Sequence, residues 1–504
     1  MRSQSVAKGT MIMIAVGFVT KVLGMANRVV ITRFLGETGV GVYMLISPTI
    51  MLLATIATVG LPVAIPTLIS RASMRQRKVL GVSLVISMSL SLLITVVLFF
   101  AARPLATYML KDERAYLPLL LTGPLLFFVS FSSILKSYFQ GKQNMTPGAV
   151  ATLIEQVVRI FLSVFLIRML LPISITHAIV GLMVASILGE LISALILTVM
   201  FVRYKRRVYP DVRMNGVKLE STNFRDVLGI SLPTTGSRLI GTITHFLEPI
   251  IVARALFRIG YTNEMSTKLY GAVSGFAIPV LFMPSFISSA VTQSIIPAIS
   301  KAHSLGRFDL IQRSLNAAFK IAFFTSGFYT VMVMLFPFEI VNLLYLTDTG
   351  ANFLYMMAPV FFLLYFQAPL VATMQAINES KLAMKASIVA SVIKIGLMVV
   401  LLAIPGVNIY GLVIAILANI VISTVWYYVI VVRKTGYRPK IWKVINGLLV
   451  LGIVYAIGRH MQNIGWNFDS ELTHVLAHSG ILLVVHSVLS FIVGLFPIGS
   501  RRGV

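Results

Sequence analysis

The stretch GFVTKVLGMANRVVITRFL, residues 17–35, decides the fold class of this chain. It is apolar enough to lie in a membrane, yet it contains Lys21 and Arg28. Together with Gly17 and Gly24, the two cations lie on one face of a helix, because their spacing is i, i+4, i+7 and i+11. A lysine or arginine at mid-bilayer costs roughly 2.5–3.5 kcal/mol on insertion scales, and such groups usually face a cavity or a partner. The stretch therefore predicts a membrane helix whose basic face is turned away from lipid.

The composition extends the membrane assignment to the whole chain. Of its 504 residues, 58% are hydrophobic and 12% are charged, and the mean hydropathy is +0.93. Soluble domains carry about 25% charged residues. We expect an all-α polytopic membrane protein with about 14 transmembrane helices, because apolar runs of about 20 residues recur from end to end. The expected spans cover about residues 9–34, 41–70, 79–101, 116–139, 148–170, 178–202, 227–257, 269–298, 317–338, 353–376, 384–404, 409–432, 442–461 and 476–497.

Several classes of function are disfavoured by what the sequence lacks. The chain has no cysteine, which excludes disulfides, thiolate metal sites and thiol catalysis. It has no phosphate-binding P-loop, no nucleophile elbow and no His-rich metal spacing, so we expect neither an enzyme nor a bound cofactor. The N-terminus leads straight into a full-length span without a cleavable signal. The net charge of +26 lies mostly in short loops, where it suits anionic membrane lipids and not nucleic acid.

The loops alternate in charge. Clusters of Lys and Arg occur at 71–78, 203–218 and 433–440, whereas the loops between them are sparse in charge or acidic, as at Glu37 and Asp348. Because cytoplasmic loops of membrane proteins carry the excess of basic residues, both termini are predicted to be cytoplasmic.

The two halves of the chain repeat each other. VVITRFL at 29–35 matches IIVARAL at 250–256 with an offset of 221, and two further sets of positions match in the same order along the chain. These sets are Pro48 and Pro66 with Pro279 and Pro297 at an offset of 231, and Gln140 and Arg159 with Gln375 and Lys394 at an offset of 235.

The repeat predicts the domain organisation. Each half holds an even number of spans, so the two six-helix lobes run parallel, with a pseudo-twofold axis along the membrane normal and a cleft between them. We expect an N-lobe at 1–202, a basic cytoplasmic linker at 203–226 and a C-lobe at 227–433. The last segment, 434–504, holds two more spans and a cytoplasmic tail outside the repeat.

Cations within the spans are the candidate substrate-binding residues. Arg33, Arg254 and Lys136 lie near span ends, where snorkelling to the interface is a sufficient alternative explanation. Glu155 and Arg159 are spaced i, i+4 and form either a structural ion pair or part of a substrate site. The candidate set is Lys21, Arg28, Arg33, Arg159, Arg238, Arg254 and Lys394.

Acidic and histidine side chains at membrane depth are candidates for ion coupling or structural pairing: Glu155, Glu190, His245 and Glu248. Arg238, His245 and Glu248 share one face of the seventh span with Gly241. One His and one Glu make an incomplete metal site, so no metal is predicted. His474 and His478 resemble a zinc pair, but histidines are common at span ends.

Prolines occupy corresponding positions in the second and eighth spans. They predict bent helices, which serve either to gate the two lobes or only to pack. The candidate kink residues are Pro48, Pro62 and Pro66 with Pro279, Pro284 and Pro297.

A basic cavity favours an anionic substrate. Guanidinium groups bind phosphate through parallel hydrogen bonds in a planar fork. A polyprenyl-pyrophosphate-linked sugar fits this chemistry, with its diphosphate on the basic stripe, its glycan in a hydrated cavity and its lipid tail in the bilayer. Its translocation requires alternating access by rocking of the lobes.

Two stretches resemble the stage V sporulation protein B family of polysaccharide-biosynthesis membrane proteins. They are GTMIMIAVGFVTKVLGMANRVVITRFLGETGVGVYMLISP at 9–48 and SYFQGKQNMTPGAVATLIEQVVRI at 137–160. That family belongs to the MOP superfamily, with MurJ-type lipid II flippases, Wzx-type exporters and MATE transporters. The resemblance implies two helical lobes around a cationic cavity. It also implies flipping of a lipid-linked peptidoglycan precursor, or a related glycan, across the plasma membrane of a spore-forming or related Gram-positive bacterium.

The resemblance also bears on single residues. MurJ relatives carry a basic residue, then Leu-Gly, then an arginine in the first helix. TKVLG at 20–24 matches this pattern, so the first basic role is carried over to Lys21. Asn27 occupies the place of the arginine, and Arg28 follows one residue round the helix, so the second role is not carried over.

Two other classes of function stay open. A MATE-like ion-coupled exporter of small molecules is disfavoured by the excess of basic over acidic cavity residues. A non-transporting scaffold that recruits cell-wall synthesis proteins through basic loops is also disfavoured, because it does not need proline kinks that match between the two halves. The energy source is equally open between the membrane potential, a proton through Glu248 or Glu155, and sodium.

Overall fold

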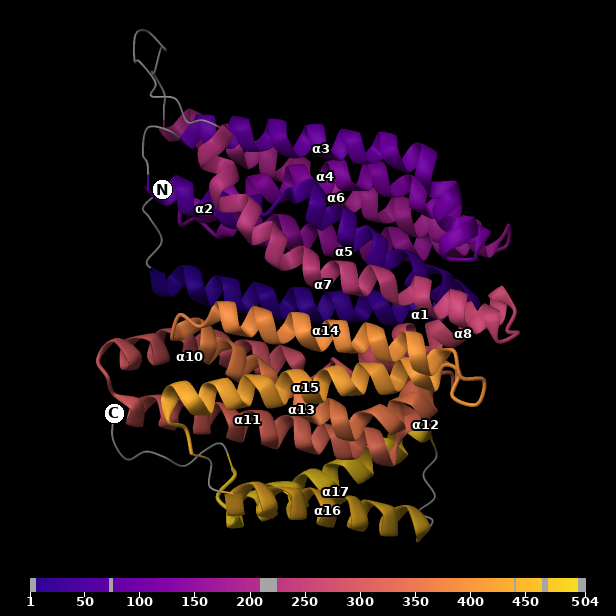
Figure 1. Cartoon of the computed structure of the whole chain (residues 1–504), viewed down its shortest axis with the longest axis vertical. Coiled ribbons are helices and arrows are strands. Elements are labelled where there is room, and N and C mark those ends of the chain that lie inside the picture. Colours follow the sequence, from indigo (N-terminus) through magenta and orange to yellow (C-terminus); the bar gives the residue numbers. More distant parts are fainter. Residues whose placement is uncertain (1–5, 72–75, 209–223, 439–440, 465–469, 497–504) are drawn as a thin grey trace. The chain divides into compact units, whose positions relative to one another are not determined.

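The structure is a computed structural model that describes residues 6–71, 76–208, 224–438, 441–464 and 470–496. Most of the expected linker, at 209–223, and the end of the expected tail lie outside these ranges. All the elements in the described residues are helices or helical turns (Figure 1). Its helices are α1 Val6–Thr58, α2 Leu61–Arg71, α3 Gln76–Pro104, α4 Tyr116–Gly141, α5 Thr146–Leu170, α6 Ile175–Val208, α7 Phe224–Arg258, α8 Asn263–Gly271, α9 Ile278–Leu281, α10 Ser285–Ser304, α11 Phe308–Leu335, α12 Pro337–Tyr345, α13 Ala351–Ala376, α14 Ser380–Leu402, α15 Tyr410–Thr435, α16 Ile441–Asn463 and α17 Glu471–Ile492. Two π-helical turns, Leu105–Met109 and Ala272–Ala277, and a 3-10 turn, Glu113–Ala115, complete the elements.

Twelve helical segments in these ranges are long and apolar enough to cross a membrane, so the chain is a multi-pass membrane protein. The first of them, Gly17–Ile69, covers most of both of the first two expected spans. Within it, α1 is bent at Gly36, where φ is 64° and ψ is −177°. The eighth expected span is not among the twelve segments found in the described residues, and the structure divides it into α8, a π-helical turn, α9 and α10. The expected count of about 14 spans therefore stays a prediction.

The helices form two compact units, Met1–Gly271 and Ala272–Val504. This division differs from the lobe boundary that the repeat places at 203–226, because α7 and α8 pack with the first unit. A Cβ at Gly60 would lie 2.6 Å from the backbone oxygen of Ser231 on α7, and a Cβ at Gly271 would lie 2.7 Å from the Cα of Gly41. Glycine at these positions permits the close approach. Lobes as the repeat defines them stay a prediction.

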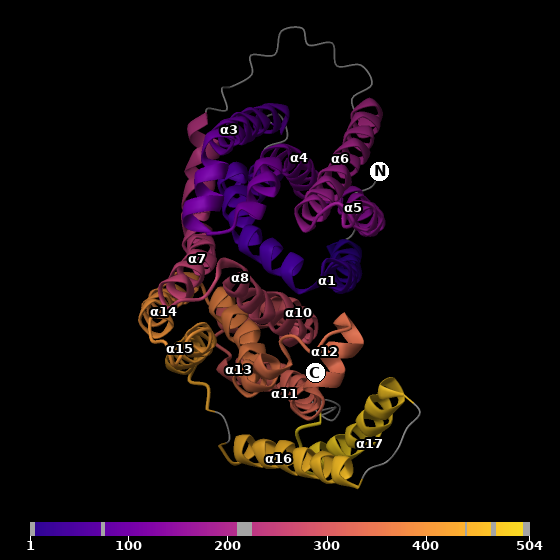
Figure 2. The same cartoon turned by 90° about the vertical axis from the view of Figure 1, so that its right-hand side faces the viewer.

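The same packing pattern occurs within each unit. In the first unit α4 packs against α2, α3 and α6, and α5 packs against α6. In the second unit α13, which corresponds to α4 in the repeat, packs against α10, α11 and α15, and α14 packs against α15 (Figure 2). The main apolar clusters follow the same helices. One includes Ile65, Ile134 and Phe139, and the other includes Ile299 and Met374.

The second and eighth expected spans are both interrupted. Val59 and Gly60, with φ of 42° and 62°, separate α1 from α2. Near this break the carbonyl oxygen of Ala57 accepts a hydrogen bond of 2.7 Å from Ser87 Oγ on α3. In membranes, irregular backbone is tolerated only where protein groups satisfy it.

In the second unit, tyrosine hydroxyl groups donate hydrogen bonds to backbone oxygens at the break between α9 and α10. Tyr329 OH donates to the Val280 oxygen at 2.7 Å, and Tyr365 OH donates to the Leu281 oxygen. Six prolines lie in or beside these interrupted segments: Pro48 in α1, Pro62 and Pro66 in α2, Pro279 in α9, Pro284 directly before α10, and Pro297 in α10. Their gating role stays a prediction.

Helices α16 and α17 lie outside the repeat and pack against each other. A capping box of Ser470 and Thr473 begins α17. Its buried face contains His478, Leu482, His486 and Ser490, while α16 packs on α11 and α17 packs on α11 and α12 (Figure 2).

Candidate functional site

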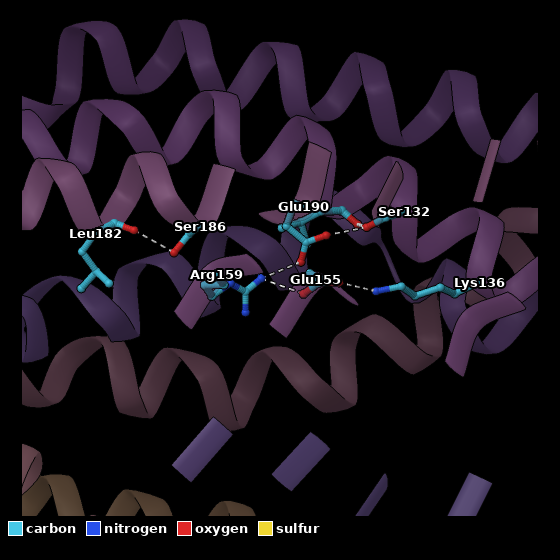
Figure 3. Close-up of polar contacts among 8 residues, drawn as sticks. Ser132, Lys136, Glu155, Arg159, Leu182, Ser186 and Glu190 are labelled. Carbon is cyan, nitrogen blue, oxygen red and sulfur yellow. Dashed lines mark hydrogen bonds and ion pairs between the residues drawn. The ribbon is translucent and has the colours of Figure 1, made fainter. Parts of the chain in front are cut away.

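A cluster of four charged side chains and one serine joins α4, α5 and α6 in the first unit (Figure 3). We call Ser132, Lys136, Glu155, Arg159 and Glu190 the α4–α6 network. Glu155 receives two cations, with Lys136 Nζ 2.9 Å from its Oε2 and Arg159 Nη2 2.7 Å from its Oε1. The same Arg159 nitrogen lies 3.3 Å from Glu190 Oε1, and Ser132 Oγ donates to Glu190 Oε2 at 2.7 Å. One arginine therefore bridges two carboxylates.

Helical spacing and a small residue place these side chains together. Ser132 with Lys136 on α4, and Glu155 with Arg159 on α5, are i, i+4 neighbours that share a face. Gly189 precedes Glu190 on α6, and a Cβ there would lie 3.3 Å from the Glu155 backbone oxygen and 3.4 Å from Arg159 Cβ. The absence of a side chain at Gly189 thus lets α6 approach α5 beside the arginine.

The network is largely withdrawn from the surface. The Glu155 and Glu190 side chains are 5% and 11% exposed, whereas those of Lys136 and Arg159 are 28% and 19% exposed. With all four groups ionised, two positive and two negative charges cancel. Such cancellation is what makes buried charge tolerable, because an isolated ion loses its hydration without compensation.

The structure corrects the interpretation of Lys136. Its position near a span end made snorkelling a sufficient explanation, but its ammonium group pairs with Glu155 on the neighbouring helix. Glu155 and Arg159 form the i, i+4 pair that their spacing predicts. Sequence reasoning missed Ser132, although its i, i+4 relation to Lys136 was a usable signal. Sequence reasoning also named no partner for Glu190, because only the fold brings α6 beside α5.

The corresponding interface of the second unit is almost neutral. At the repeat offset of 235, Val371 replaces Lys136, Ala390 replaces Glu155 and Gln367 replaces Ser132. Gln367 Nε2 donates to Ser423 Oγ at 2.9 Å and to Thr424 Oγ1 at 2.8 Å, so amide and hydroxyl groups join α13 to α15. A helix pair of the same kind therefore packs with neutral residues at the positions that match Ser132, Lys136 and Glu155. Lys394, which matches Arg159, is buried at 6% exposure.

The other candidate cations of the first unit lie on α1 and α7, which pack against each other. Lys21, Arg33 and Arg238 are exposed on the surface of this unit, and Arg28 is half-buried. Arg28 Nη2 lies 3.1 Å from Met44 Sδ, across the bend at Gly36. Arg254, also exposed, donates to the backbone oxygen of Tyr108 at 3.4 Å.

The predicted acidic residue of α7 is buried. Glu248 is 6% exposed, and its Oε2 lies 3.9 Å from Nδ1 of the exposed His245. His474 and His478 on α17 stack with their ring centroids 4.2 Å apart. Within the part of the chain that the structure describes, no group of three or more His, Asp or Glu residues is placed to hold a metal ion.

Comparison with known proteins extends these observations. A family model described as polysaccharide biosynthesis protein matches residues 6–303, and a model described as MatE matches residues 263–400. Stage V sporulation protein B of Bacillus subtilis (strain 168) is 39% identical over 449 residues, which cover 88% of this chain and 86% of that protein.

Two further matches concern a protein named lipid II flippase MurJ. The Bacillus subtilis (strain 168) protein of that name is 21% identical over 491 residues, covering 92% of this chain and 89% of its own. A solved structure of lipid II flippase MurJ in an inward closed conformation has a TM-score of 0.70 at 16% identity, covering 95% of this chain and 97% of that one. The fold described above is thus shared along nearly the whole chain.

Proposed function

Because this chain belongs to the polysaccharide biosynthesis protein family, within the MOP superfamily of flippases and transporters, we propose that it flips a polyprenyl-pyrophosphate-linked glycan across the bacterial plasma membrane. The substrate class we propose is lipid II or a related precursor of peptidoglycan or spore cortex. Two relatives support this choice, since one is named a sporulation protein and the other a lipid II flippase.

The proposal rests on how charged residues are distributed within the first unit, where the glutamates at membrane depth are buried and the cations Lys21 and Arg238 are exposed. At membrane depth the glutamates Glu155, Glu190 and Glu248 are all buried, with 3%, 8% and 6% of the whole residue exposed. Lys21 and Arg238, in contrast, are exposed on α1 and α7. A surface at membrane depth that exposes cations and hides carboxylates favours an anionic ligand over a cationic one.

A diphosphate matches this surface chemically. Charge-assisted hydrogen bonds to phosphate contribute about 1.5–3 kcal/mol each, and arginine adds a planar fork that lysine lacks. We assign the primary contacts to Lys21, Arg28 and Arg238, with Arg33 and Arg254 nearer the span ends. Movement between leaflets would follow from alternating access, with both termini on the cytoplasmic side as the basic loops indicate.

The test is translocation of fluorescent lipid II in proteoliposomes. The triple variant Lys21→Gln/Arg28→Gln/Arg238→Gln should slow flipping by at least about tenfold, because loss of 1.4 kcal/mol of binding is already a factor of ten. Its matched control is Arg103→Gln/Arg168→Gln/Arg258→Gln, which removes three exposed cations of the same unit. The control should stay within about twofold of the parent.

An equal loss of flipping in both triple variants would mean that flipping depends only on net charge. Unchanged flipping in the Lys21/Arg28/Arg238 variant would contradict the assignment of these residues to the diphosphate. Export of cationic dyes by the parent protein, without lipid II flipping, would instead favour a small-molecule exporter.

A further inference from the structure

The charge of the α4–α6 network is more than packing requires. The second unit has Val371, Ala390 and Gln367 at the positions that match Lys136, Glu155 and Ser132, and it keeps one buried cation, Lys394, at the position of Arg159. Gln367 donates to hydroxyl groups of α15. Burying ions where neutral groups suffice costs stability in general. At the positions that match Glu155 and Glu190, the second unit has Ala390 and Val425. The buried pair of carboxylates in the first unit is therefore better explained by a task that needs a group able to change its charge.

The two carboxylates of the network are not equivalent. Glu155 holds two cations at 2.9 and 2.7 Å, so its negative charge is firmly compensated. Glu190 shares one of these cations, Arg159, at the longer distance of 3.3 Å, and its other oxygen accepts from the neutral Ser132. The titratable and charged groups that act on Glu190 are Lys136 from α4 and Glu155 and Arg159 from α5. Glu190 is the carboxylate with the weaker compensation.

A proton suits this position better than a metal cation. Sodium and other hard cations need a shell of several oxygen ligands, as calcium and magnesium do. Around Glu190 the neighbouring groups include a guanidinium and an ammonium, which repel a metal cation. A proton needs a single carboxylate oxygen. The Lys136 and Arg159 side chains, which contact the buried carboxylates, are themselves 28% and 19% exposed.

We propose that Glu190 is a proton-binding site, and that its protonation couples a proton gradient to the transport cycle. A proton from water forms an O–H bond with the Glu190 carboxylate, and the network changes from neutral to one net positive charge. Arg159 then keeps Glu155 as its only anionic partner in the network, which loosens the link between α5 and α6. The coupling half of this inference rests on the proposed function, whereas proton binding at Glu190 does not.

Infrared difference spectroscopy on the purified, full-length protein tests proton binding without any substrate. Acidification should produce a C=O band with one component from protonated Glu190, and this component should be missing in Glu190→Gln and retained in Glu264→Gln. Glu264 is an exposed glutamate of α8, paired with Lys268 at 3.2 Å, and serves as the control. Retention of this component in Glu190→Gln overturns the assignment.

A second variant keeps the test decisive where Glu190→Gln folds poorly. Ser132→Ala removes the hydroxyl that donates to the ionised carboxylate, so the Glu190 component should titrate about one pH unit higher than in the parent protein. A purely structural role of the network would leave the titration midpoint in place, and an unmoved midpoint therefore contradicts the proposal.

Transport in proteoliposomes with an imposed pH gradient tests the coupling. Flipping by the parent and by Glu264→Gln should respond to the gradient, and flipping by Glu190→Gln should not. A normal Glu190 component of the band with no lipid II flipping in the parent would reject the proposed function and leave the proton site standing. A gradient response that persists in Glu190→Gln would reject the coupling.

Discussion

Lys136 shows how a charged side chain is accommodated inside a membrane protein. Its ammonium group lies 2.9 Å from Glu155 and its side chain is 28% exposed, so it gains a strong acceptor and keeps part of its hydration. Removal of one partner from such a pair leaves the other charge uncompensated, which is the costly outcome for buried ions.

We expect Lys136→Met to lower the stability of the protein by about 1–3 kcal/mol, since Glu155 keeps only Arg159 as a cationic partner. The cost should fall when Glu155→Gln is added, because the neutral amide no longer needs the ammonium group. A double-mutant cycle, measured by denaturation in detergent, reports this coupling. Additive single effects would show that the pair contributes nothing specific.

At the scale of the element, glycines and donor side chains control how closely helices approach and where they break. Gly189 lets α6 pass close to Arg159 on α5. Ser87 and Tyr329 each donate to a carbonyl oxygen freed by a helix break, one in each unit. The interrupted spans are thereby compatible with a membrane interior, where backbone groups need protein partners.

We expect Gly189→Leu to destabilise the α5–α6 pair by about 1–3 kcal/mol through overpacking, and Gly189→Ala to have a smaller effect. The matched control is Gly452→Leu in α16, where an added Cβ meets no atom within 4 Å. Thermal unfolding of the three variants in detergent measures the effect. Equal unfolding temperatures for the two leucine variants would contradict the close approach at Gly189.

At the scale of the whole molecule, the topology depends on residues 263–304. This segment is divided among α8, a π-helical turn, α9 and α10, and the span expected within it is not among the twelve spanning segments found in the described residues. The expected number of crossings and the sidedness of everything that follows it depend on whether this broken segment crosses the membrane.

The chain has no native cysteine, so single cysteines report sidedness directly. We expect Thr262→Cys to react with a membrane-impermeant maleimide in intact cells, and Gly306→Cys to react only after permeabilisation. Asp348→Cys should behave like Thr262→Cys, because the positive-inside pattern places both outside. Reaction of Thr262→Cys and Gly306→Cys from the same side would show that the broken segment does not cross.

The sequence by itself determined the class of this protein, its long helices and its internal repeat. Apolar runs of spanning length and alternating loop charge are local properties, so they are readable without a fold. Repeat mates at fixed offsets likewise predicted that α4 and α13 occupy corresponding positions. The two helices have similar packing neighbours within their own units, while the lobes themselves stay a prediction.

Only the tertiary structure decided which charges meet. Glu155 and Arg159 are close in sequence, and their pairing was predictable, but Lys136 and Glu190 lie on other helices. Their approach depends on packing between α4, α5 and α6, which helical periodicity does not encode. For the same reason the place of α7 and α8 with the first unit was not predicted, since it rests on close contacts at Gly60 and Gly271. Hydropathy describes one helix at a time, whereas a buried charge is defined by its neighbours in space.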